Sequence, residues 1–136
     1  MPISALDNMV SVGLFDENKL KEIEVIASEF NYSYIKTALN FGFLTRKKYV
    51  AFLEQEGFEL IAVRDEEMDM QYIEQCELIE LNSILYAPLR KMPDGTLLVA
   101  AADPQDEKLK TLLTIRFKMP VRFVAASDLD LSLIHI

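Results

Sequence analysis

Two segments of the first half of the chain repeat the same order of apolar and polar positions. Residues 12–20 are matched by residues 41–49, with Gly13 and Gly42 at equivalent places. In each copy an apolar residue is followed by glycine, two apolar residues, a helix-capping residue, three polar residues and an apolar residue. A period of about 30 residues is typical of a repeated supersecondary unit. The pattern therefore predicts one small motif that is used twice.

The physics of this motif favours a helix, a tight turn and a second helix. Gly13 and Gly42 fit the position just past a helix, where the left-handed backbone conformation costs least without a Cβ. Asp16 and Thr45 follow three residues later, and their oxygens can accept hydrogen bonds from the free N–H groups of the next helix. Apolar residues then recur every three to four positions in both copies. We expect four short helices over residues 1–64.

Six aromatic residues fall on the apolar stripes of these helices. A residue on the periodic apolar face of a helix is more often part of a core than of a ligand cage. We therefore expect all six in the core: Phe30, Tyr34, Phe41, Phe43, Tyr49 and Phe52.

A β-hairpin gives the strongest signal in the second half. Apolar runs over residues 84–90 and 96–102 flank the turn 91–95, which contains the pair Asp94-Gly95. An Asp-Gly pair between two apolar runs is typical of a hairpin, because glycine adopts the positive backbone angle that the turn requires.

Helix and strand signals alternate in the remainder of the second half. Asp103 fits a helix N-cap, with Pro104 at the first helical position and acidic residues in the first turn. Pro120 ends that helix, residues 121–125 alternate like a strand, and Ser127 with Asp128 can cap a last helix. Residues 58–63 are expected to form a short strand or the end of a helix-to-strand connection, and residues 68–80 a helix. We predict an α+β fold: a small helical bundle from the tandem repeat, then a three- or four-stranded sheet with helices packed on one side.

Acidic residues are concentrated at one place in the chain. The chain has 136 residues and a net charge of −8, but residues 1–64 carry seven basic and nine acidic side chains and residues 83–136 carry seven and six. Residues 65–82 carry seven acidic side chains and no basic one. We therefore predict three parts: a helical tandem-repeat subdomain (1–64), an acidic connector and helix (65–82) and an α+β subdomain (83–136). The acidic stretch is either a solvated connector or a docking surface for a basic partner, with Glu66, Glu67 and Asp69 as candidate binding residues.

Charge and composition exclude several classes of function. An acidic chain whose longest basic run is residues 46–48 does not suit binding of nucleic acid. No apolar stretch approaches the length of about 20 residues that spans a bilayer, and the start shows no leader pattern. The single cysteine, Cys76, agrees with a reducing compartment. We predict a cytoplasmic protein, with recruitment to the inner membrane by a partner as an option.

The residues that could carry chemistry are few. The chain has no Gly-rich phosphate loop, and its one histidine, His135, is the penultimate residue of the sequence. Cys76 lies among glutamates, which do not favour a reactive thiolate. Glu66, Glu67 and Asp69 lack the loop spacing of a calcium site. We therefore expect no catalytic residue, no metal site, no cofactor and no enzyme.

The chain resembles the N-terminal domain of type II secretion and type IV pilus assembly ATPases, which are bacterial proteins. The tandem motif carries one part of this resemblance. The rest lies in the Ala-Pro-Leu-Arg segment at 87–90, the run from Asp94-Gly95 through Ala102-Asp103-Pro104 to Asp106, and residues 121–127. The resemblance spans essentially the whole chain.

This family implies two kinds of partner. Some of its members bind cyclic di-GMP through the tandem motif, and others use the domain to dock onto a membrane-platform protein. The nucleotide-binding motif begins with Arg-Leu-Gly and closes with Gln. The corresponding places in this chain lack both arginines, both leading glycines and both glutamines: Ser4, Ala5, Leu6 and Ala27 in the first copy, and Ser33, Tyr34, Ile35 and Glu56 in the second. A diphosphate ligand would lose its charge-assisted bonds there.

The resemblance thus implies a non-catalytic adaptor domain that binds a protein of a secretion or pilus machine and does not bind nucleotide. Two alternatives stay open at this point. The chain could be a cyclic di-GMP receptor with variant contacts, or it could regulate an attached ATPase or glycosyltransferase.

Overall fold

Strand β3 (Leu97–Ala101) contains no polar residue, and the sheet is arranged around it. The computed structural model describes residues 9–10, 13 and 16–134. Its four strands pair in the order β1 (Leu60–Ile61), β4 (Val121–Ala126), β3 and β2 (Tyr86–Lys91). Strand β3 is antiparallel to β2 and parallel to β4, and β4 is parallel to β1. All five residues of β3 are buried. The predicted hairpin is therefore confirmed, and so is the α+β fold class.

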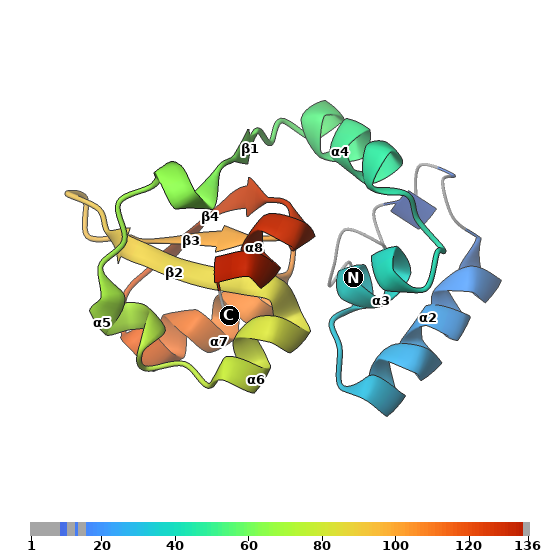
Figure 1. Cartoon of the computed structure of the whole chain (residues 1–136), viewed down its shortest axis with the longest axis horizontal. Coiled ribbons are helices and arrows are strands. Elements are labelled where there is room, and N and C mark those ends of the chain that lie inside the picture. The colour runs from blue at the N-terminus through green and yellow to red at the C-terminus, as the bar shows by residue number, and fades with distance from the viewer. Residues whose placement is uncertain (1–8, 11–12, 14–15, 135–136) are drawn as a thin grey trace.

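Figure 1 shows the helical half beside the sheet, helix α8 (Asp128–Ile134) on one face of the sheet and helix α7 (Glu107–Phe117) on the other. None of the helices within the described ranges is long and apolar enough to cross a membrane. The elements, in chain order, are α2 (Glu17–Phe30), α3 (Tyr34–Asn40), α4 (Arg46–Gln55), β1 (Leu60–Ile61), a 3-10 turn (Val63–Asp65), α5 (Met70–Ile73), α6 (Leu78–Glu80), a π-helical turn (Leu81–Leu85), β2 (Tyr86–Lys91), β3, α7 (Glu107–Phe117), β4 (Val121–Ala126) and α8 (Asp128–Ile134).

The sheet is covered on both faces, so the prediction of helices on one side was wrong. Alternate residues of β3 enter two different cores: Leu98 and Ala100 belong to the core that also contains Leu131 of α8 and residues of the helical half, whereas Leu97 and Val99 pack with α7. Successive side chains of a strand point to opposite faces. A continuous apolar run, as in residues 97–101, is typical of a strand buried on both faces.

The predicted turns and caps of the helical half are confirmed. Gly42 has φ +79° just after α3, and Gly13 has φ +84°. The Asp16 carboxylate accepts from the backbone N–H of Lys19 at 2.8 Å, and the Thr45 hydroxyl accepts from the N–H of Lys48 at 3.3 Å. These features depend on neighbours in the sequence, which is why the repeat alone could predict them.

Two predicted helices differ from those observed. Helix α7 is capped by Asp106, whose carboxylate accepts from the N–H of Leu109 at 3.0 Å, while Asp103 and Pro104 lie in the preceding turn. The predicted helix over 68–80 is divided into α5 and α6. The N–H of Asp69 donates to the carbonyl of Leu89 in β2 at 2.7 Å. This hydrogen bond fixes the start of the segment against the sheet. The segment therefore does not form the single helix that its apolar periodicity predicted.

The aromatic residues of the helical half are divided between core and surface. Tyr49 and Phe52 are buried as expected, and Tyr34 and Phe43 are partly buried against the same core. The expectation was wrong for Phe30 and Phe41, which are 51% and 46% exposed. Their rings lie 5.4 Å apart, so they cover each other at the surface.

Polar contacts join the helical half to the sheet half. The buried hydroxyl of Tyr49 on α4 donates to the carbonyl of Ala102, just after β3, at 2.6 Å. Burial raises the pKa of Tyr49 far above its ordinary value, so the hydroxyl keeps its proton at neutral pH. The Nε and Nη2 groups of Arg46 donate three hydrogen bonds to the buried carboxylate of Asp128 at the start of α8. These bonds orient α4 relative to the end of the sheet.

The Tyr49 hydroxyl gives a direct test of this junction. Replacing Tyr49 with Phe removes the donor and leaves the buried Ala102 carbonyl unpaired, which we expect to lower the free energy of unfolding by about 1–2 kcal/mol. Urea denaturation followed by circular dichroism measures the change. Tyr32→Phe is the control, because no hydrogen bond joins the Tyr32 hydroxyl to the described part of the chain; we expect a change within about 0.5 kcal/mol. Equal effects of the two substitutions would contradict the role given to Tyr49.

Candidate partner-binding surface and the degenerate nucleotide motif

The acidic stretch 65–82 runs along β2, which is an edge strand of the sheet. Besides the bond from Asp69 to Leu89, the guanidinium of Arg90 on β2 donates to the Glu66 carboxylate at 3.3 Å and to the Glu67 carbonyl at 3.0 Å. These bonds hold the acidic segment against an edge that would otherwise be open to pairing with another strand. The segment is therefore part of the folded structure and does not act as a free linker.

Most carboxylates of this segment face solvent. Five of the seven acidic residues are exposed: Asp65, Glu67, Asp69, Glu74 and Glu77. The other two, Glu66 and Glu80, are partly buried, and each is paired with an arginine. Since the segment contains no basic residue, its outer side presents negative charge to solvent.

Glu80 belongs to an internal polar cluster between α6, β2 and α7. Arg116 donates two hydrogen bonds to the Glu80 carboxylate, at 2.7 and 3.1 Å, and the Tyr86 hydroxyl donates to the same carboxylate. The bond to Arg116 is the main cause that lowers the pKa of Glu80, while burial is the main cause that raises the pKa of Tyr86. The Sγ of Cys76 lies 3.8 Å from the same guanidinium. This carboxylate is occupied within the fold.

The three predicted binding residues lie close in sequence but have different environments. Glu66 pairs with Arg90, Glu67 is exposed, and Asp69 caps α5 by accepting from the N–H of Gln71 at 3.3 Å. The part of the chain that the structure describes contains no cluster of three side chains suited to a metal ion. Glu67 is thus the one of the three whose carboxylate makes no bond to the described residues, and it is the most accessible to a partner.

The structure places the second copy of the nucleotide motif within the fold of the helical half. Ile35, in the place of the motif glycine, is 1% exposed and belongs to the main core. Ser33, in the place of the arginine, caps α3 by accepting from Lys36, and its own N–H donates to the carbonyl of Ser83 at 2.8 Å. Tyr34 is partly buried and Glu56 is exposed.

In the first copy, the closing position lies on α2. Ala27 is 3% exposed on α2 and contributes to the buried face of that helix. Ser4, Ala5 and Leu6 lie outside the described residues, as does His135. The structure therefore brings together Ser33, Tyr34 and Ile35 at the start of α3, and it places Ala27 on the helix that precedes them.

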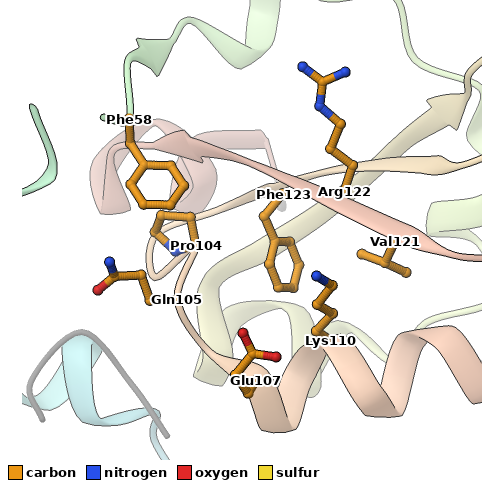
Figure 2. Close-up of a pocket in the computed structure, with 8 residues that line it drawn as sticks. All are labelled: Phe58, Pro104, Gln105, Glu107, Lys110, Val121, Arg122 and Phe123. Carbon is orange, nitrogen blue, oxygen red and sulfur yellow. The ribbon is translucent and has the colours of Figure 1, made fainter. Parts of the chain in front are cut away.

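The sequence did not predict a pocket of about 470 Å³ between β4 and the turn before α7. Figure 2 shows the eight lining residues, which include Phe58, Pro104, Lys110, Arg122 and Phe123. One signal was present: Arg122 interrupts an otherwise apolar strand. That signal alone could not reveal a pocket, because the pocket depends on how far the neighbouring strand β1 extends.

Two solved structures are similar to the chain over nearly its whole length. A structure of MshE with cdg has a TM-score of 0.55 and 19% identity, and the match covers 95% of this chain and 94% of that chain. A structure of the N-terminal domain of XpsE has a TM-score of 0.63 and 15% identity, and the match covers 96% of this chain and 91% of that chain. The fold is that of secretion and pilus ATPase N-terminal domains.

This likeness confirms the fold that the tandem repeat and the hairpin predicted. No family model and no curated protein sequence matches the chain. The ATPase N-terminal-domain fold therefore persists here at sequence identities below one fifth. At such identities the core positions are retained as apolar, while surface positions are free to change.

The acidic surface can be tested separately from the fold. We expect the triple substitution Glu66→Lys, Glu67→Lys and Asp69→Lys to keep the native circular dichroism spectrum and to lower the free energy of unfolding by about 1–2 kcal/mol, through the loss of the Arg90 pair and the α5 cap. The control is the triple substitution Glu67→Lys, Glu74→Lys and Glu77→Lys, which changes the net charge by the same amount at exposed positions. It should lower the free energy of unfolding by less. Unfolding of either variant at 25 °C would show that the acidic segment is needed for folding.

Proposed function

We propose that the chain is a non-catalytic protein-interaction domain, an adaptor of a bacterial secretion or pilus machine, and that it does not bind cyclic di-GMP. The proposal rests above all on Ile35. A glycine at this place would let backbone approach a nucleotide, but here an isoleucine side chain fills the core. The helix that would present the ligand motif is therefore used for packing.

The polar groups at the motif positions support the same proposal. Ser33 stands in the place of the arginine. Its hydroxyl accepts a hydrogen bond from the N–H of Lys36 and its own N–H donates to the carbonyl of Ser83, so both groups already have partners within the fold. An acidic side chain, Glu56, stands in the place of the closing glutamine. A phosphate oxygen near Glu56 would meet a like charge in place of a hydrogen-bond donor. Neither residue offers the charge-assisted bonds that a phosphate prefers.

The acidic surface supplies the feature that a protein partner could recognise. Five exposed carboxylates lie on one continuous segment, and this segment is held to β2 by the bond from the Asp69 N–H to the Leu89 carbonyl and by the bond from the Arg90 guanidinium to the Glu67 carbonyl. A fixed charged surface favours association with a partner of opposite charge, mainly by raising the association rate. We propose a basic surface on a protein of the secretion or pilus machine as the partner, and this partner would recruit the domain to the inner membrane.

Calorimetric titration with cyclic di-GMP tests the first part of the proposal. We expect no measurable heat of binding, since both the arginine and the glycine of the second motif are replaced. MshE, whose structure contains cdg, is the positive control under the same conditions. Binding with a dissociation constant of about 1 μM or below, which corresponds to about −8 kcal/mol, would instead establish the chain as a cyclic di-GMP receptor with variant contacts.

Charge reversal tests the second part. The immobilised domain is presented with the cytoplasmic domain of the membrane-platform protein from the same genome. We expect Glu67→Lys, Glu74→Lys and Glu77→Lys together to weaken binding by about tenfold or more, because reversed charges repel a basic partner. The matched control reverses three exposed glutamates of the helical half: Glu22, Glu24 and Glu54. Equal binding by both variants would remove the acidic segment as the docking site.

A further inference from the structure

The strand β4 has an edge that its neighbour covers only at one end. On one side β4 pairs with β3 from Val121 to Ala125. On the other side its partner is β1, which has two residues and pairs only with Ala125 and Ala126. Within the described chain, no strand pairs with residues 121–123 on this second side. A part of the sheet edge is therefore open beside β1.

The backbone of this open edge is oriented for pairing. The carbonyl of Pro120, which is the one polar backbone group of this residue, accepts from the N–H of Leu97 in β3 at 2.8 Å and so points to β3. In a strand, the N–H and C=O groups of successive residues point alternately to the two neighbouring strands. The backbone groups of Val121 and Phe123 thus point away from β3, toward the place where β1 would continue.

The pocket described above lies along this edge. Its lining includes the consecutive residues Val121, Arg122 and Phe123. Successive side chains of a strand point to opposite faces, so three in a row can line one pocket only where the pocket spans the strand's edge. Figure 2 shows this arrangement: the Phe123 ring points to the α7 side of β4 and Arg122 points to the other side. Phe58, which precedes β1, stands at the far end of the pocket.

The charges at this edge oppose the charge of the chain as a whole. The lining contains two cations, Lys110 and Arg122, and one acid, Glu107, in a chain of net charge −8. Lys110 and Arg122 are exposed, and neither is in an ion pair with any residue that the structure describes. The edge therefore combines open backbone groups, the Phe123 ring with the oppositely charged Lys110 and Glu107 of α7 on one side, and the positive charge of Arg122 on the other side.

We propose that an extended segment of a partner protein, in which apolar residues alternate with acidic ones, docks here as an added strand beside β4. Its backbone would pair with the groups of Val121 and Phe123, which is the mode of recognition by strand addition. Its apolar side chains would contact Phe123 and Phe58, and its acidic side chains would face Arg122. This surface is separate from the acidic segment, so the proposal goes beyond the adaptor function and does not depend on it.

The probe is a fluorescently labelled, capped hexapeptide with three Val-Glu repeats, which extends over about 20 Å. Fluorescence anisotropy is measured at 0.15 M salt, where the Debye length of about 8 Å screens the distant acidic residues. A hexapeptide with three Val-Lys repeats is the charge control. We expect the glutamate peptide to bind the full chain about tenfold or more tightly than the lysine peptide.

Two protein variants and two modified peptides test the mechanism. Arg122→Glu should reverse the preference between the peptides, whereas Lys21→Glu, an equal charge change on the exposed side of α2, should leave it unchanged. N-methylation of the three valines and N-methylation of the three glutamates block opposite edges of the peptide. We expect only one of these two modifications to abolish binding, because one edge of an added strand faces β4 and the other faces solvent.

Several results would overturn the proposal. Equal binding of the two N-methylated peptides would mean that the backbone is not recognised, and equal effects of Arg122→Glu and Lys21→Glu would mean that only net charge acts. If neither peptide binds and the Arg122→Val variant self-associates, Arg122 instead protects the edge from strand pairing. A dimer in sedimentation analysis that Arg122→Glu dissociates, without peptide binding, would make a second copy of this chain the occupant.

Discussion

The burial of β3 on both faces is the constraint on which the other parts of the structure depend. Five apolar residues in sequence cannot leave either side of the strand in water, so each face needs a covering layer. Helix α7 and the segment containing Tyr72 provide one layer, while α8 provides the other, and the helical half packs against the same core from beside the sheet. The tandem repeat is therefore more than an appended module, because its apolar side chains complete the core on one side of the sheet.

This constraint also explains where polar groups are used inside the molecule. A helical layer that is held only by apolar contact could slide over the sheet, since the hydrophobic effect is not directional. Hydrogen bonds from Tyr49 to Ala102, from Lys36 to the carbonyl of Asn82 and from Arg46 to Asp128 fix its position. All of these bonds connect residues that are far apart in the sequence, and together they define one relative placement of the two layers.

The parts of the fold that the sequence predicted are those decided by neighbouring residues. Asp16, Thr45 and Gly42 act within one turn of their own positions, so a repeat of residue types suffices to place them. The exposure of Phe41 and the second covered face of the sheet depend on contacts between distant segments, which periodicity does not encode. The acidic segment was found as a candidate surface from charge alone, but its attachment to β2 was not. The pocket escaped prediction because it follows from the two-residue length of β1.

The pairing of β1 with β4 has a consequence for biosynthesis. Leu60 meets Ala125, and the N–H of Val63 bonds to the carboxylate of Asp130, so the middle of the chain closes against residues that are made much later. Contacts of such long sequence separation slow folding, because the loop between them must close first. The helical half leaves the ribosome well before Leu131, which fills the shared core. During that interval its apolar face lacks its native cover, and this is the period in which the nascent chain is most open to capture by a chaperone.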